Sequence, residues 1–153
     1  MALRNIVQIG DQTLRKKCFE VTDFGEKTHA LLEDMKQTLK KSEGVGLAAP
    51  QVGVLRRIFV ISLDGKYYEC INPKIIEQSG SQEGEEACLS VRGKSGVVVR
   101  PNKVTLVALD RNGKPFTVKG EGLMARAICH ENDHLDGILY IDKAKYVQGD
   151  DRY

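Results

Sequence analysis

Several features are rare in this sequence or missing from it, and the missing apolar runs and the low net charge exclude classes of protein. Its 153 residues include no tryptophan and only four prolines, and no internal repeat or low-complexity tract is present. No apolar run approaches the length needed to cross a membrane, and the first ten residues lack the apolar core of a signal peptide. The net charge is only +2 and the basic residues are scattered, which argues against DNA or a membrane surface as a partner.

Disulfides are also not expected. The four cysteines, Cys18, Cys70, Cys88 and Cys129, follow no framework spacing, and without a targeting segment we expect a reducing, cytoplasmic location. The composition, 41% hydrophobic and 29% charged, is that of a globular protein rather than a disordered one. The length suits one core, so we expect a single domain over residues 1–153.

The N-terminal half predicts one helix followed by strands. Residues 28–41 carry apolar side chains at helical spacing and polar ones on the other side, which indicates an amphipathic helix. Residues 57–63 and 67–71 are strand-like and are joined by Asp64-Gly65, a favoured hairpin turn. Residues 74–78 could add another strand.

The C-terminal half predicts a loop, more strands and a second helix. Residues 79–96 are rich in Gly, Ser and Glu and are expected to form a loop, while 97–119 alternate as strands around an Asn-Gly turn. Residues 122–135 have helical periodicity, and 142–153 are polar and are expected to form a small or frayed ending. The pattern predicts an α+β fold, with antiparallel or mixed sheets packed around the C-terminal helix and an amphipathic helix near the N-terminus.

The second predicted helix carries the strongest chemical signal, the run His130-Glu131-Asn132-Asp133-His134. Residues four apart lie on one helix face, about one turn from each other, so two imidazoles can bind one metal ion. Glu131 would then reach a water molecule on that ion. The pattern predicts metal-dependent hydrolysis with His130 and His134 as ligands and Glu131 as the proton carrier.

A catalytic ion needs a third protein ligand and an open position. In one large class of zinc proteases a further His follows the helix, but Tyr140 stands at that position here. The remaining candidate is upstream, at Cys88, whose thiolate would offset part of the charge of the ion. Cys18, Cys70 and Cys129 are expected to be packing residues.

Three ordered segments resemble the motifs of peptide deformylases, and the similarity extends from Arg4 to Gly137. The resemblance implies an enzyme that removes the N-formyl group from the initiator methionine of newly made polypeptides and releases formate. It implies one divalent metal ion, most often Fe(II), with Zn(II), Ni(II) or Co(II) as alternatives. The segments are Gly44-Val45-Gly46-Leu47-Ala48-Ala49-Pro50-Gln51, Glu86-Ala87-Cys88-Leu89-Ser90 and His130-Glu131-Asn132-Asp133-His134.

The resemblance also implies roles for single residues. Cys88, His130 and His134 would be the metal ligands, and Glu131 the general acid and base. The side-chain amide of Gln51 and the backbone N–H of Leu89 would hold the developing oxyanion, and Gly46 would lie against the substrate backbone. The implied partners are formylmethionyl nascent peptides near the ribosome, met by a monomer without DNA or membrane contact.

The methionine of such a substrate needs an apolar pocket, and the sequence departs from the family pattern beside it. Ala87 stands where the family usually has Gly, so its methyl group is expected to alter the fit of the substrate. The resemblance also implies, from the family positions of the two residues, that Arg100 pairs with Asp133 and steadies the helix. The candidate pocket residues, which could equally be core residues, are Val45, Leu47, Leu123 and Ala127.

Three other interpretations remain open. A metallopeptidase would cleave internal peptide bonds without needing a formyl group. A cysteine enzyme would use Cys88 as nucleophile and His130 as base, without metal. A closed structural zinc site would need a fourth protein ligand and would leave Glu131 without a role.

Overall fold

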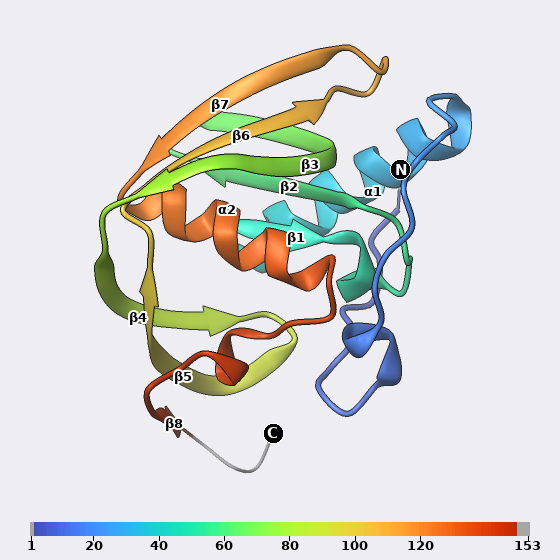
Figure 1. The fold of residues 1–153 in the computed structure, drawn as a ribbon. Coiled ribbons are helices and arrows are strands. Elements are labelled where there is room, and N and C mark those ends of the chain that lie inside the picture. The colour runs from blue at the N-terminus through green and yellow to red at the C-terminus, as the bar shows by residue number, and fades with distance from the viewer. Residues whose placement is uncertain (1, 150–153) are drawn as a thin grey trace.

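The computed structural model describes residues 2–149 and has the predicted α+β architecture, with two helices and two antiparallel sheets in that range (Figure 1). Helix α1 spans Glu26–Ser42, close to the predicted 28–41, and ends at Glu43 in the left-handed conformation (φ 58°). Helix α2 spans Leu123–His134. It begins after Gly122 (φ 62°), and Gly137 (φ 76°) follows three residues after its end.

The larger sheet has the strand order β1-β2-β3-β6-β7. The predicted hairpin is present, because β2 and β3 pair across Asp64 and Gly65, both with positive φ (53° and 75°). Residues 74–78 do not form a separate strand but continue β3 past an irregularity in its pairing. The strands are β1 (Gly46–Ala48), β2 (Ile58–Leu63), β3 (Lys66–Ser79), β6 (Lys103–Leu109) and β7 (Pro115–Glu121).

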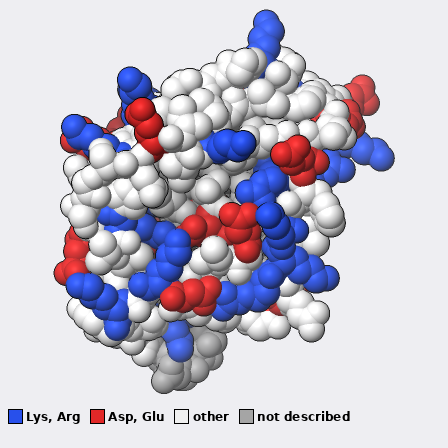
Figure 2. Space-filling model, viewed as in Figure 1, with Lys and Arg blue, Asp and Glu red and all other residues white. Residues whose placement is uncertain are grey.

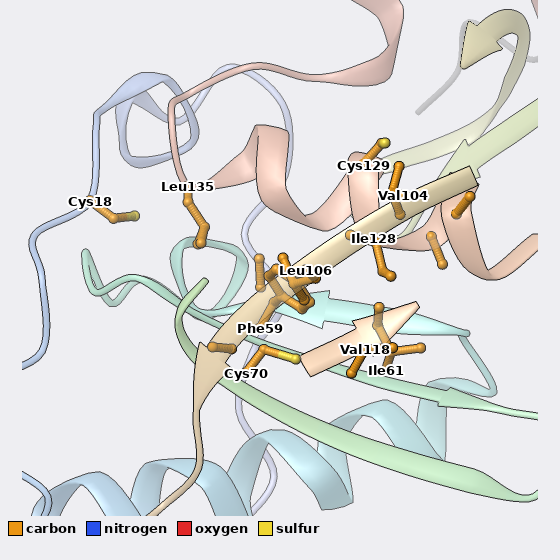
Figure 3. Close-up of a cluster of buried hydrophobic side chains, with 14 residues drawn as sticks. Cys18, Phe59, Ile61, Cys70, Val104, Leu106, Val118, Ile128, Cys129 and Leu135 are labelled. Atoms are coloured by element: carbon orange, nitrogen blue, oxygen red, sulfur yellow. The ribbon is translucent and has the colours of Figure 1, made fainter. Parts of the chain in front are cut away.

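The two helices cover opposite faces of this sheet. Along β2, Phe59 and Ile61 belong to the core against α2, whereas Ile58 and Val60 belong to the core against α1. Four consecutive buried residues in β2 follow from this arrangement, because both faces of the strand are covered. Figure 3 shows the α2 side, where Ile128 points toward Phe59, Ile61 and Val118. The core between α2 and one face of the sheet therefore holds α2 in place.

The cysteine packing predictions are confirmed by the same core. Cys18, Cys70 and Cys129 are free, buried thiols within the cluster on the α2 side (Figure 3). In the part of the chain that the structure describes, no helix is both long enough and apolar enough to cross a membrane.

The predicted loop over residues 79–96 is wrong, because these residues form most of a second sheet. Strand β4 (Gln82–Cys88) pairs antiparallel with β5 (Val91–Arg100). Gly and Glu disfavour strands in general, and five of the six residues of β4 that precede Cys88 are Gln, Glu or Gly, so this strand has no clear sequence signal. Its register shifts between Glu86 and Cys88, so Ala87 lies at an irregularity in the hairpin.

Of the predicted small or frayed ending, the structure shows the small one for residues up to 149. After the short 3-10 helix Tyr140–Asp142, residues Val147–Gly149 form β8 and pair with β5, completing the order β4-β5-β8. The rest of that prediction, residues 150–153, lies outside the described residues.

The N-terminal segment contains the 3-10 turn Gln12–Arg15. It packs near another 3-10 turn, Ala49–Val52, through a hydrogen bond from Val7 N–H to the carbonyl oxygen of Gln51.

Candidate metal centre and active site

Three side chains that can bind a metal ion meet between α2 and β4. The Sγ of Cys88 and the ring nitrogens of His130 and His134 lie within 4.8 Å of one another. The Sγ of Cys88 is 3.4 Å from Nε2 of His134. Tetrahedral ligation with sulfur at about 2.3 Å and nitrogen at about 2.0 Å from an ion would place them about 3.6 Å apart. The three predicted ligands thus fit a single divalent ion.

Glu86 fixes the orientation of the first histidine. Its Oε1 is 2.9 Å from Nδ1 of His130, which leaves Nε2 of that ring free for an ion. Burial disfavours a charged His130, but Cys88 and Glu86 outweigh it and raise the pKa of His130 to about 10. The hydrogen bonds with Cys88 and Glu86 therefore favour positive charge at this ring, and a divalent ion can take the place of the proton.

The second histidine is in a different environment. Burial lowers the pKa of His134 to about 3, so the ring is neutral and can donate a lone pair from Nε2. Its Nδ1 is buried and has no hydrogen-bond partner within residues 2–149. The rings of His130 and His134 are 5.2 Å apart at their centroids, as successive turns of one helix face allow.

Glu131 is buried beside the ligands without an ion-pair partner in the described chain. Its side chain is 4% exposed, and its Oε1 makes no hydrogen bond within residues 2–149. Burial raises its pKa to about 7, the range that suits a group exchanging protons near neutral pH. Gly46 makes room for it, because a Cβ added at Gly46 would lie 2.5 Å from Oε2 of Glu131.

Gln51 reaches the same site from the 3-10 turn after β1. Its Oε1 accepts a hydrogen bond from the backbone N–H of Ala48 (2.9 Å), which fixes the orientation of the amide. Its Nε2 therefore points at the site, where it lies 3.1 Å from Oγ of Ser90 and 3.5 Å from Sγ of Cys88. Leu89 follows Cys88 directly and lines the cavity beside these groups.

A cavity of about 370 Å³ opens onto these groups, a volume suited to a small ligand or a few residues of peptide. Four of the candidate substrate residues line it together with Gly46, and Leu123 and Val45 are exposed at its edge. Leu47 does not line it, because its side chain is fully buried in the core against α1. The candidates that line the cavity are Val45, Ala87, Leu123 and Ala127.

The predicted pair of Arg100 and Asp133 is confirmed, with Nη1 to Oδ2 at 2.7 Å. Arg100 also binds both carboxylate oxygens of Glu86 at 2.9 Å, and Arg126 binds Glu86 at 2.6 Å. Burial opposes ionisation of Glu86, but its hydrogen bonds with Arg100 and His130 prevail and lower its pKa to about 2. The sequence analysis assigned no role to Glu86 or Arg126. The general need of a metal-bound histidine for a carboxylate or carbonyl partner could have pointed to Glu86.

These features define a class of protein, the metal-dependent hydrolases. They are an H-E-x-x-H helix, a cysteine sulfur from a neighbouring strand and a buried carboxyl group beside both. The profile of the polypeptide deformylase family matches residues 3–149. The chain belongs to the polypeptide deformylase family.

Individual relatives agree with this placement. The chain is 51% identical to the peptide deformylase of Thermoanaerobacter pseudethanolicus over 144 residues, which is 94% of this chain and 91% of that protein. It is 53% identical to the peptide deformylase of Lachnoclostridium phytofermentans, covering 94% and 90% of the two chains.

Solved structures show the same fold. A peptide deformylase from Legionella pneumophila superposes with a TM-score of 0.91 at 44% identity, covering 94% of this chain and 86% of that one. The peptide deformylase from Thermotoga maritima gives 0.92 at 35% identity, covering 94% and 99%. The protein is therefore an enzyme of this family, and deformylation is favoured over the metallopeptidase alternative.

Proposed function

We propose that this enzyme removes the formyl group from the N-terminal formylmethionine of nascent polypeptides, with one Fe(II) ion held by Cys88, His130 and His134. The observation that carries the proposal is the convergence of these donors within 4.8 Å beside the buried carboxyl group of Glu131. Nitrogen and sulfur donors suit Fe(II) and Zn(II) alike, and the family resemblance favours Fe(II). When bound, such an ion would lower the pKa of a water molecule to about 7 and polarise the formyl oxygen.

Glu131 is the proton carrier in this proposal. Its carboxylate takes a proton from the attacking water as the water oxygen bonds to the formyl carbon. It then delivers the proton to the methionine nitrogen as the carbon–nitrogen bond breaks, so that formate and a free amine leave. A pKa near 7 supports both steps, because the group can accept and release a proton at neutral pH.

Gln51 and Leu89 stabilise the charge that develops on the formyl oxygen. The Nε2–H of Gln51 is already directed at the site, since Ala48 N–H fixes the other end of its amide. The backbone N–H of Leu89 is the second proposed donor. Donors fixed before the reaction cost no reorganisation when the charge appears, which is the main source of their effect on rate.

The substrate chain would lie extended between the edges of β1 and β4. Both strands end their sheets, and the residues of β1 and β4 that line the cavity include Gly46 and Ala87. The methionine side chain would enter the part of the cavity beside Leu123, Ala127 and Val45. Ala87 adds a methyl group at this edge, and we expect it to limit bulky side chains in the second substrate position.

The test is formate release from formyl-Met-Ala-Ser, using protein purified anaerobically with Fe(II). We expect activity in the natural protein, and loss of activity in Glu131→Ala and in Cys88→Ala, with metal lost only in Cys88→Ala. The exposed Glu83→Ala is the matched control and should remain active. Reloading the metal-free protein with Fe(II), Zn(II), Ni(II) or Co(II) in turn would rank the ions.

Each competing function has its own outcome in this test. Cleavage of unformylated Met-Ala-Ser would indicate a metallopeptidase. Activity that survives complete metal removal would indicate Cys88 as a nucleophile. Bound metal with no formate release in any form would contradict the proposal.

We further propose that residues 1–153 form one catalytic domain that acts as a cytoplasmic monomer on nascent chains near the ribosome. The low net charge and the lack of a membrane-crossing helix in the described residues support this. Sedimentation at micromolar concentration gives the oligomeric state, and a dimer would contradict the monomer.

A further inference from the structure

Arg126 lines the wall of the cavity, although a buried cation is unusual in a pocket for an apolar side chain. It lies on α2, and its side chain is only 6% exposed. Its Nη1 donates to Oε2 of Glu86 (2.6 Å) and to two backbone carbonyl oxygens of the smaller sheet, those of Val98 (3.1 Å) and Gly84 (3.3 Å). Its Nη2 donates to Oε1 of Gln82 at 3.2 Å.

Gly84 makes this position possible. It is a strand residue without a positive φ, so its backbone conformation does not require glycine. A Cβ added there would lie 2.9 Å from Nη2 and 3.4 Å from Nε of Arg126. Glycine weakens a strand, and its presence in β4 is explained by the space that the guanidinium group needs.

One donor of this guanidinium group is left over. Across residues 2–149, no acceptor receives a hydrogen bond from the Nε–H of Arg126. This Nε is not among the fully buried unpaired atoms of the described residues, so solvent in the cavity can reach it. A ligand that covers it without offering an acceptor would leave the donor unpaired at a cost, whereas a ligand with an acceptor would avoid that cost.

The position along α2 matches the length of a methionine side chain. Arg126 precedes the ligand His130 by four residues, which is about 6 Å along the helix axis. Ala127 beside it is small and leaves room in the cavity for a long, thin side chain. A side chain that starts at the reacting centre and runs toward Leu123 therefore ends near Arg126.

We propose that Arg126 is a specificity-determining residue, whose Nε–H donates a hydrogen bond to the thioether sulfur of the substrate methionine. This rests on the proposed function, since it concerns the side chain that follows the formyl group. A purely apolar pocket would bind norleucine, the isostere with CH₂ in place of sulfur, at least as well as methionine. A donor in the wall reverses that order, because norleucine would leave the Nε–H unpaired.

The experiment compares kcat/KM for formyl-Met-Ala-Ser and formyl-norleucyl-Ala-Ser with the Fe(II) enzyme. Because sulfur is a weak acceptor, we expect methionine to be preferred by roughly fivefold. A third peptide, with an ether oxygen in place of the sulfur, carries a stronger acceptor and should also exceed norleucine. Equal values for all three peptides, or a preference for norleucine, would overturn the proposal without involving any variant.

Two variants then locate the effect. Arg126→Lys keeps the charge beside Glu86 but lacks the Nε–H, and Gly84→Ala displaces the guanidinium group while every polar group remains. In both, the methionine-to-norleucine ratio should fall toward one, chiefly through the methionine value. Arg111→Lys, far from the cavity in the turn between β6 and β7, is the control and should keep the natural ratio.

The outcomes separate this inference from the proposed function. No formate from formyl-Met-Ala-Ser with the natural protein would contradict the function itself. Formate release with a ratio that stays unchanged in folded, metal-loaded Arg126→Lys and Gly84→Ala would contradict only the role of Arg126. Circular dichroism and metal analysis establish that each variant is folded and loaded.

Discussion

Two buried carboxyl groups accompany His130: Glu86 is hydrogen-bonded to its ring, and Glu131 follows it in the sequence. They share burial but differ in their charged partners. Glu86 is 6% exposed and is surrounded by Arg100, Arg126 and His130, whereas Glu131 is 4% exposed and has one oxygen without a partner in the described chain. The pKa of Glu86 falls to about 2, while that of Glu131 rises to about 7. Burial alone therefore does not set the protonation state.

The difference lies in the partners of each group. Hydrogen bonds with Arg100 and His130 keep Glu86 ionised, so it acts as a fixed anion that orients a ligand and balances charge. Burial without such partners leaves Glu131 able to change its protonation state, which proton transfer requires. Figure 2 shows acidic side chains near the centre of one face, surrounded by Lys and Arg, so charge pairing is also a feature of the surface.

The largest expected loss of activity comes from replacing Glu131, the group that carries the proton. Glu131→Gln should lower kcat for formate release by about 100- to 10 000-fold, since general acid–base catalysis contributes that much. Metal content should stay the same, because the ligands are untouched. Formate assays beside metal analysis check this, and loss of the ion would show that Glu131 has a structural role instead.

The next effect comes from removing the fixed anion. Glu86→Ala leaves Arg100 and Arg126 buried without their common partner, so the free energy of unfolding should fall by about 3–5 kcal/mol. Metal affinity should weaken about 10- to 100-fold because His130 loses its orienting carboxylate. Urea unfolding and competition with a chelator measure the two effects. Glu86→Gln, which keeps one acceptor, should lie between Glu86→Ala and the natural protein in both measurements.

A smaller effect is expected for one of the partners of Glu86. Arg100→Lys keeps a positive charge but cannot bind both oxygens of Glu86 and also Asp133, as the guanidinium group does. The free energy of unfolding should fall by about 2 kcal/mol, the strength of one or two charged hydrogen bonds. Unchanged stability and activity would mean that Arg100 does not steady α2.

The smallest effect is expected at the edge of this network. Lys143 pairs with Asp133 at 3.0 Å, but its side chain is 45% exposed. Lys143→Ala should therefore cost less than about 1 kcal/mol, and high salt should reduce the difference further. Thermal unfolding at low and high salt measures it. A loss of stability as large as that expected for Arg100→Lys would show that the ion pairs around Asp133 stay strong at the surface.

Local sequence patterns predicted the parts of the molecule that lie within one helix or one turn. Helix α2 and the Asp64-Gly65 turn have local signals, namely apolar spacing and a residue pair that tolerates positive φ. Strand β4 was missed because Gly84 and Glu86 serve contacts with α2 and have low strand propensity. Its Glu86 binds α2 and β5 residues that are 14 to 44 positions away, and no local pattern encodes such pairing.

The close approach of Gly46 to Glu131 makes positions 46 and 131 behave genetically as one site. Any side chain at 46 displaces the carboxyl group, so Gly46→Ala should cause a severe loss of stability in the otherwise natural protein, although Gly46 itself carries no reactive group. Once Glu131 is shortened to Ala, the same substitution has nothing to displace and should add little further loss of stability. The two changes are therefore epistatic, and surveys that vary one position at a time will misjudge how much variation the β1 edge can tolerate.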